Sequence, residues 1–305
     1  MSLNLEYVFS APSMMRLQRT KWSQKNPEGQ EKLRLAICEG IIWIRNESRR
    51  IMADDKMKMS VLFNAFVEST QGAFIDNQGA FEFDNVYGDS GGLQMVTRDI
   101  EITDDLRRGV YTVQDKFANF GFCFDEIPLG LKPGADAGKK HRSQTSSKQF
   151  RNHEHDECAA RTARNIKEQT DFFHAKGENT KAFYILQGND SSHIVSWFKA
   201  GLNAGVNWDC IQGLAPADTC IGNGELESVE MLRACHILKD RYGTKTGNHI
   251  HLLGVGSTYR LIPAIFLKQS GFINNDIQLS FDSSSSSMSF MMGNFFNRDG
   301  SKPGK

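Results

Sequence analysis

The chain has 305 residues, and 36 Lys plus Arg balance 36 Asp plus Glu, so its formal net charge at pH 7 is zero. This length can bury a complete core and fits one large domain better than two small ones. Because the charge is balanced, the sequence excludes a global attraction to nucleic acid or to a membrane surface, and any site for a polyanion must be a local patch.

Residues 1–22 lack the continuous apolar core of a secretion signal, and no run approaches about 18 apolar residues. The six cysteines are scattered and never form a C-x-x-C pair, which favours reduced thiols over a disulfide framework or a zinc knuckle. We therefore expect a cytoplasmic protein with no membrane partner. The cysteines are Cys38, Cys123, Cys158, Cys210, Cys220 and Cys235.

The first half of the chain is predicted to contain strands and helices in turn. Apolar runs indicate strands, and apolar residues at helical spacing indicate helices. Residues 58–68 remain open, either as a strand or as the end of the preceding helix. The other expected elements are a strand over 3–11, a helix over 28–52, a strand ending at Asp89, a helix over 105–120, and a strand through Asp125 closed by Pro128.

Residues 129–157 show no apolar period and are predicted to be an irregular, basic insertion. A long loop inside a compact domain is usually functional or disordered. This loop follows the carboxyl end of a strand, so we expect it to lie next to the end of the sheet at which the strands finish. Between Lys132 and Arg151 it has one acid, Asp136, against Lys132, Lys139, Lys140, Arg142, Lys148 and Arg151.

The second half alternates strand and helix regularly. The expected helices cover 158–177, with Gly177 as a cap, 191–205, 226–243 and 258–271. The expected strands cover 182–188, 206–213, 249–256 and 276–282. Such alternation implies a parallel sheet, with seven or eight strands in all. Residues 283–305 barely suffice for one closing helix, so either that helix is short or a partner or further tail covers the barrel.

Six of the predicted strands deliver a polar residue or a glycine near their carboxyl end. In a parallel α/β barrel those ends share one rim, and catalytic groups of such folds lie there. We therefore predict a single (β/α)8 barrel domain, a TIM barrel, over residues 1–305. The rim residues are Asp89, Asp125, Gln187 with Gly188, Gly213, Gly254 and Asp282.

Seven short motifs resemble, in order and rough spacing, the signatures of the tRNA-guanine transglycosylase superfamily. Each motif is weak alone, but the resemblance extends over about residues 80–290. The motifs are DSGGLQ at 89–94, FDE at 124–126, ARTARN at 160–165, ILQGN at 185–189, QGLA at 212–215, HLLGVG at 251–256 and SFD at 280–282.

Proteins of that superfamily are (β/α)8 barrels that exchange guanine in a polynucleotide for a 7-deazaguanine base. The resemblance implies that Asp282 is the nucleophile and that Asp89 is the general acid and base. It implies a base pocket formed by Ser90, Gly91, Gly92, Asp125, Gln187, Gly213 and Leu214. It also implies that Gly254, Val255, Gly256, Ser257 and Arg260 meet the nucleic-acid backbone.

The chemistry suits these residue types. Cleavage of an N-glycosidic bond develops positive charge at C1′, so a carboxylate can attack there and hold a covalent sugar intermediate. The leaving purine needs a proton and the incoming base must lose one, and Asp89 can do both. The amide edge of a purine is complementary to a carboxylate, a side-chain amide and a backbone N–H, which Asp125, Gln187 and Gly213 would supply.

Three departures from the superfamily pattern affect the expected polymer. Serines 283–287 replace a Pro-Thr-Arg segment, the carboxyl-terminal zinc module is missing, and Gln212 stands where a glycine is usual. These losses spare the base chemistry and remove parts that grip tRNA. We therefore expect a relative of the phage DNA transglycosylases, acting in the host cytoplasm if a phage encodes it. Lys139, Lys140 and Arg142 would contact phosphates.

No cofactor and no metal is expected. His153, His155 and Cys158 invite a metal interpretation but lack a second ligand cluster. His249 and His251 share one strand face, which usually means ordinary packing.

The expected partners are DNA, or tRNA in its place, and a 7-deazaguanine base such as a preQ0-type precursor, with a homodimer or partner subunit possible. Two further functions are compatible with the sequence. One is that of a non-catalytic, nucleic-acid-binding subunit of a heteromeric transglycosylase, and the second is that of an unrelated metal-dependent hydrolase.

Overall fold

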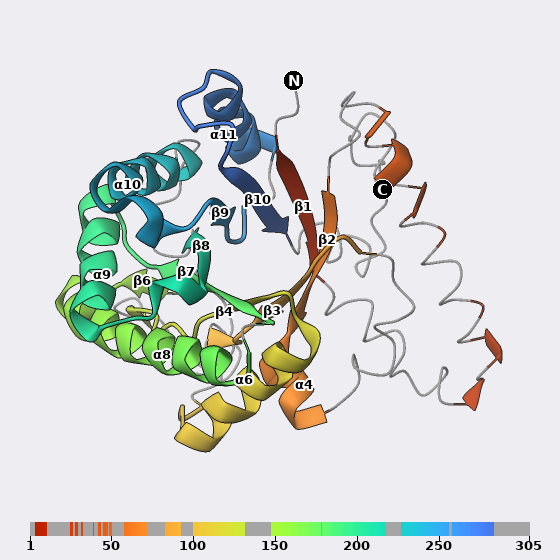
Figure 1. Ribbon diagram of the computed structural model, residues 1–305, viewed down its shortest axis with the longest axis horizontal. Coiled ribbons are helices and arrows are strands. Elements are labelled where there is room, and N and C mark those ends of the chain that lie inside the picture. The colour runs from red at the N-terminus through yellow and green to blue at the C-terminus, as the bar shows by residue number, and fades with distance from the viewer. Residues whose placement is uncertain are drawn as a thin grey trace.

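The computed structural model describes residues 4–10, 58–71, 83–92, 100–131, 148–177, 179–217, 227–255 and 258–283, with isolated positions between 25 and 50. Eight parallel strands close into a barrel in which each strand pairs with its neighbours in chain order (Figure 1). The predicted TIM-barrel architecture is therefore confirmed. The strands are β1 Leu5–Ser10, β2 Lys58–Asn64, β3 Val86–Asp89, β4 Phe120–Phe122, β7 Lys181–Leu186, β8 Ile211–Pro216, β9 His249–Leu252 and β10 Gln278–Ser283.

Helices surround the barrel on its outside (Figure 1). They follow the strands in the order that the predicted alternation requires. None of the helices in the described ranges is long and apolar enough to cross a membrane. The helices are α4 Ala65–Gln71, α6 Asp104–Phe117, α8 His155–Ala175, α9 Ser191–Ala204, α10 Glu227–Tyr242 and α11 Thr258–Gln269.

Local chemistry explains where several of these elements begin and end. Thr103 and Asp190 cap α6 and α9 by accepting hydrogen bonds from the backbone N–H groups of Leu106 and His193. Gly177 has a φ of +98°, as a glycine that ends a helix does. The open segment 58–68 contains both a strand and a helix, because β2 ends at Asn64 and α4 begins at the next residue.

Two strand predictions were too long. Strand β4 stops at Phe122, so Asp125 lies three residues beyond it rather than at its last position. Strand β8 begins only at Ile211, because Trp208–Cys210 form a 3-10 turn in which the Asn207 side chain accepts from the N–H of Asp209. The strand therefore continues to Pro216, and Gly213 lies inside it.

The segment 129–157 is more regular than predicted at both ends. Strand β5, Leu129–Leu131, pairs antiparallel with β6, Lys148–Phe150, and helix α8 already begins at His155. Arg151, one of the predicted basic residues, donates to Glu154 at 2.7 Å. Lys139, Lys140 and Arg142 lie outside the described residues.

The barrel interior is divided into an aromatic part and a polar part. Tyr87, Phe120, Phe122 and Phe183 make mutual ring contacts with centroids 5.0 to 5.9 Å apart, on neighbouring strands β3, β4 and β7. Strands β1, β2, β9 and β10 instead contribute buried polar side chains. TIM-barrel interiors are usually filled by branched aliphatic residues, so a polar interior requires that its groups satisfy one another. These polar residues are Glu6, Ser60, His249, His251 and Ser280.

Glu6 is the centre of this polar interior. It is fully buried on β1, and its carboxylate accepts hydrogen bonds from four side chains. Asn85 donates at 2.8 Å and Tyr87 at 3.0 Å, and Ser60 and Gln278 donate as well. A carboxylate offers about four lone-pair sites, so these donors saturate it. Glu6 thereby joins strands β1, β2, β3 and β10 across the inside of the barrel.

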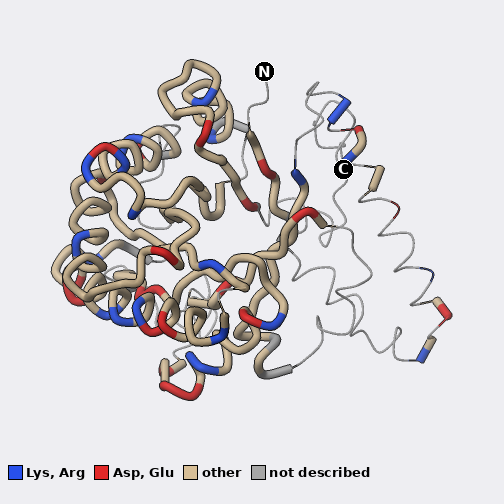
Figure 2. Tube along the Cα trace, in the orientation of Figure 1, with Lys and Arg blue, Asp and Glu red and all other residues tan. Residues whose placement is uncertain are grey.

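Charged residues on the outside are mixed in sign. Figure 2 shows Lys and Arg interspersed with Asp and Glu over the outer helices. Arg107 of α6, for example, donates to Glu168 of α8 at 2.8 Å. Among the described residues, the outer helices therefore offer no uniformly cationic face.

We predict that Glu6→Ala lowers the free energy of unfolding by about 3 to 5 kcal/mol, because four donors, of which Ser60 and Tyr87 are fully buried, would lose their acceptor. Urea denaturation measures the loss. The matched control is Glu230→Ala on α10, whose carboxylate is partly exposed and pairs with Arg233 at 3.3 Å. It should change stability by less than about 0.5 kcal/mol. A loss below about 1 kcal/mol for Glu6→Ala would contradict the central role of Glu6.

Candidate active site

Asp282 lies near the carboxyl end of β10, with its carboxylate held through one oxygen. Oδ1 accepts from the backbone N–H of Gly254 at 2.8 Å and lies 3.1 Å from His251 Nε2. The residue is 8% exposed, and the described residues give Oδ2 no hydrogen bond. One oxygen of this carboxylate is thus fixed by two N–H groups.

Asp89 is the last residue of β3 and lies at the same rim. Its carboxylate accepts from the backbone N–H groups of Gly91 and Ser90 and from Asn64 Nδ2 at 3.3 Å. Desolvation by the surrounding protein raises the pKa of Asp89 to about 6, and the nearby negative charge of Asp282 also raises it, although the backbone N–H groups act in the opposite direction. The residue is therefore poised between its two protonation states near neutral pH.

Asp125 is buried beside Asp89 and is paired with Gln187 of the loop after β7. Gln187 Nε2 donates to Asp125 Oδ2 at 2.5 Å. Desolvation raises the pKa of Asp125 to about 7; the Gln187 hydrogen bond opposes this, and the charge of Asp89 adds to it. The three carboxylates form one electrostatic cluster, because Asp89 acts on Asp125 and Asp282 acts on Asp89.

The predicted glycine turn packs directly against this cluster. Gly91 has a φ of +82°, which glycine adopts without strain. A Cβ on Gly92 would lie 2.4 Å from Asp125 Oδ1, so only a glycine fits there. The backbone N–H groups of Ser90 and Gly91 bind the carboxylate of Asp89. The turn therefore brings Asp89 and Asp125 together.

Two buried polar atoms next to the cluster have no hydrogen-bond partner among the described residues. They are Ser90 Oγ and Gln187 Oε1, and both residues are almost fully buried. Buried polar groups are rarely left unpaired. With Asp125, they provide a carboxylate, an amide oxygen and a hydroxyl that could bind the polar edge of a small planar ligand.

Some predicted site residues are not at this rim. Gly213 lies inside β8 and pairs with His249, which itself pairs with Gln278 of β10, four residues before Asp282. A Cβ on Gly213 would lie 1.9 Å from the His249 carbonyl oxygen, so this glycine permits close strand packing. Leu214 is 1% exposed and belongs to the hydrophobic core. The prediction that Gly213 ends its strand was wrong, because β8 continues to Pro216, and the expected contacts of these two residues with a base stay a prediction.

The residues after β9 that were expected to meet the nucleic-acid backbone have different positions in the structure. Gly254 binds Asp282, as described, but the side chain of Val255 is fully buried in the core and cannot face a nucleic-acid backbone. Gly256 and Ser257 lie outside the described residues. Arg260 lies in the first turn of α11, where its backbone carbonyl accepts from Ser228 Oγ at 2.5 Å.

Sequence reasoning missed the residues that hold the carboxylates. It assigned His249 and His251 to ordinary packing, yet His251 contacts Asp282. The sequence did contain a signal. Residues two apart on a strand point to the same face of the sheet, so His249 and His251 share one face of their strand. Ser280 and Asp282 likewise share one face of the next strand along the chain. Asn64 carried no comparable signal, because its segment could not be assigned to a strand.

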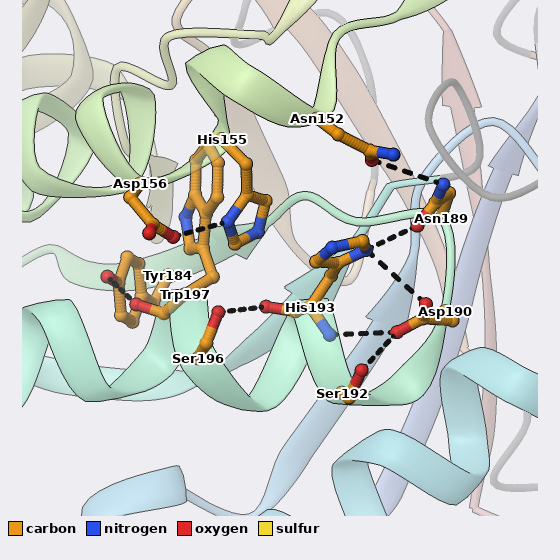
Figure 3. A network of polar contacts seen from close by, with 10 residues as sticks. All are labelled: Asn152, His155, Asp156, Tyr184, Asn189, Asp190, Ser192, His193, Ser196 and Trp197. Carbon is orange, nitrogen blue, oxygen red and sulfur yellow. Dashed lines mark hydrogen bonds and ion pairs between the residues drawn. The ribbon is translucent and has the colours of Figure 1, made fainter.

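A second polar network lies near the rim, at the start of α9 (Figure 3). His193 Nδ1 is hydrogen-bonded to Asn189 and lies 3.4 Å from Asp190. The ring of His155 lies 4.7 Å from that of His193 and bonds to Asp156 at 2.9 Å. Within the described ranges no group of three His, Cys, Asp or Glu residues could hold a metal ion. His155 and Cys158 lie on helix α8 rather than in an irregular loop.

The sequence matches no protein-family model, and no curated protein matches it. The chemistry of the site therefore has to be argued from the carboxylate cluster and its neighbours.

We predict that Asp125→Asn makes the protein more stable at high pH. The folded-state pKa of Asp125, about 7, lies above its ordinary value, so the folded protein keeps a proton that the unfolded chain has lost. This carboxyl therefore lowers stability progressively as the pH rises from about 4 to about 7. The variant should gain about 2 to 4 kcal/mol relative to the original protein at about pH 8, and little at about pH 4.

Urea denaturation at both pH values measures this difference. The matched control is Asp209→Asn, which removes an exposed carboxylate and should leave the pH dependence unchanged. An Asp125→Asn variant with the same pH dependence as the original protein would contradict the burial of an ionisable group at this position.

Proposed function

We propose that this protein is a base-exchange glycosyltransferase that replaces guanine in a polynucleotide, in particular DNA, with a 7-deazaguanine base. The observation that carries the proposal is the coupling of Asp89 and Asp282 at one barrel rim. The described residues leave one oxygen of Asp282 without a hydrogen bond, and Asp89 has a pKa of about 6. This pair is suited to nucleophilic attack assisted by proton transfer.

In the first step, Asp282 Oδ2 attacks C1′ of the target nucleoside. The new C1′–O bond forms an ester, and the glycosidic C1′–N bond to guanine breaks. Asp89 in its protonated form donates its proton to the departing purine. The pKa of about 6 favours this role, because an acid that titrates near the working pH combines adequate population with adequate strength.

In the second step, Asp89 acts as a base. It removes the proton from the ring nitrogen of the incoming 7-deazaguanine, and that nitrogen attacks C1′. The C1′–O bond to Asp282 breaks, and Asp282 leaves as a carboxylate. Both aspartates return to their starting states, so the exchange needs no cofactor.

The base itself would be bound by the neighbouring polar groups. Guanine and 7-deazaguanine share an edge with an N–H, an amino group and a carbonyl. Asp125 can accept from the donors on this edge, and the unpaired Gln187 Oε1 can accept from another donor. The unpaired Ser90 Oγ can donate to the carbonyl. This arrangement fits a purine with an amide edge better than adenine.

DNA is proposed over tRNA because serines 283–287 stand where the superfamily has a Pro-Thr-Arg segment with basic contacts to the nucleic-acid backbone. The run of serines follows β10, which ends at Ser283. A tRNA substrate with the same chemistry is the competing possibility that the experiment has to separate.

The test is incorporation of a labelled 7-deazaguanine base into duplex DNA or into tRNA. We predict label in DNA, with none in tRNA. Asp282→Asn should lower the rate by about 10³-fold or more because it removes the nucleophile. Asp89→Asn should lower it by about 10² to 10⁴-fold because it removes the proton donor. Asp209→Asn serves as the control and should retain full activity.

Incorporation only into tRNA would contradict the choice of DNA while keeping the reaction. Incorporation into neither polymer, with nucleic acid still bound, would favour a non-catalytic binding subunit. Activity that a chelator abolishes would favour a metal-dependent enzyme instead.

A further inference from the structure

We propose that His251 is a positioning residue for Asp282, and that the buried chain of His251, Ser280 and His249 fixes which oxygen of Asp282 reacts and helps it to leave. This inference rests on the proposed function, because it assigns Asp282 the role of nucleophile. It concerns residues that the transglycosylase motifs do not include as functional groups.

This series of hydrogen-bonded side chains runs inward from Asp282 between the two neighbouring strands β9 and β10. His251 Nε2 lies 3.1 Å from Asp282 Oδ1, and His251 Nδ1 lies 2.8 Å from Ser280 Oγ. Ser280 Oγ lies 2.6 Å from His249 Nε2. All three residues are buried, with His251 and Ser280 fully so. Strands β9 and β10 pair His251 with Ser280 directly, so backbone register holds the contact in place.

The hydrogen-bond roles along this chain follow from the acceptor at its end. An ionised carboxylate can only accept, so His251 Nε2 must carry a proton. If His251 is neutral, its Nδ1 accepts from the Ser280 hydroxyl, and His249 Nε2–H donates to the same hydroxyl oxygen. Burial lowers the pKa of His249 well below its usual value, which keeps that ring neutral. The chain therefore directs an N–H at Asp282 and prevents the ring from rotating.

The consequence for Asp282 is an asymmetric carboxylate. Oδ1 receives two N–H donors, from His251 and from Gly254, and Oδ2 is left for C1′. In the proposed ester, Oδ1 becomes the carbonyl oxygen. When the incoming base displaces Asp282, negative charge returns to the carboxylate, and the same two donors stabilise it. Fixed donors at an oxygen where charge develops are an effective means of catalysis.

Other ionisable groups surround these three hydrogen-bonded side chains, and each can contribute to the pH dependence of the reaction. Asp89 of β3 acts on Asp282 from across the rim. Lys58 of β2 acts on His249, and Tyr87 of β3, which donates to Glu6 of β1, lies next to Ser280. His251 is the only one of the described ionisable side chains for which the structure gives a hydrogen bond to Asp282. Removing His251 should therefore alter the position and reactivity of the Asp282 carboxylate more than removing any of these other groups.

The competing explanation is that the histidines are only packing residues. His251 does pack among aromatic rings, with its centroid 4.8 Å from Phe122 and 5.6 Å from Tyr87. Packing alone predicts that a ring of similar size restores function. Positioning predicts that the N–H is needed. The two explanations therefore differ in what His251→Phe and His251→Gln do.

The experiment uses the full chain with duplex DNA and a labelled 7-deazaguanine base, in single-turnover conditions. Formation and decay of the protein–DNA adduct are followed across pH for three variants. His251→Phe keeps a ring without an N–H donor. His251→Gln presents an amide N–H near the former Nε2. Ser280→Ala leaves the imidazole but removes the hydroxyl that orients it. His236→Phe on α10, which is remote from the rim and partly exposed, is the control.

We expect His251→Phe to slow decay of the adduct by about 10 to 100-fold, so that the adduct accumulates, because the departing carboxylate loses a donor. His251→Gln should restore decay to within about 5-fold of the original protein, because its amide replaces the lost donor. Ser280→Ala should lie between the two, and His236→Phe should change neither rate.

Normal adduct decay in His251→Phe, with exchange intact in the original protein, would overturn this inference and leave the proposed function standing. Absence of adduct and exchange in the original protein would overturn both. If His251→Phe does not fold, His251→Gln and His251→Asn make the same comparison, since the shorter Asn amide cannot reach Asp282. Equal rates for these two variants would then overturn the inference.

Discussion

Three carboxylates share one end of the barrel, where burial disfavours the ionised forms of two of them, Asp89 and Asp125. Asp125 and Asp282 are buried, and Asp89 is electrostatically coupled to both. Like charges in a poorly solvated site cannot all be ionised at equal cost, so the groups separate into different roles. Asp282 receives two N–H donors at one oxygen. Asp89 and Asp125 have raised pKa values and can hold protons near neutrality.

Hydrogen-bonded side chains inside the barrel hold this arrangement in place. In many barrels the inside is an apolar filling, but here Glu6 accepts from four donors. A second hydrogen-bonded group, formed by His249, Ser280 and His251, leads to Asp282 at the rim. A change at Ser280 would therefore reach Asp282 through the orientation of His251.

Much of the fold could be predicted from the sequence because strand and helix patterns alternate regularly from Lys181 onward. The placement of Asp89, Asp125, Gln187 and Asp282 at one rim follows from the same alternation, since parallel strands share their carboxyl ends. Gly213 was misplaced because the sequence Trp208–Cys210 resembles the start of a strand but forms a 3-10 turn, which moves the strand later in the chain. Periodicity cannot detect such a turn, because its stability depends on a single side-chain cap.

The supporting residues could not be predicted for a different reason. A pattern on one strand does not reveal its partner on a neighbouring strand, and the contact between His251 and Asp282 depends on the register of β9 and β10. The same holds for Gly92. A glycine is required there because Asp125, from a distant part of the sequence, occupies the space that a Cβ would take. Close contacts between distant segments are properties of the closed barrel.

The central claim is that Asp89 and Asp282 form an electrostatically coupled pair at one rim. A carboxyl-carbon NMR titration of Asp89, in the intact chain and in Asp282→Asn, tests it most directly. The account predicts a midpoint near a pH of about 6 for Asp89 and a lower midpoint once the charge of Asp282 is removed. A midpoint near the ordinary value of an aspartate, unchanged by the substitution, would contradict it.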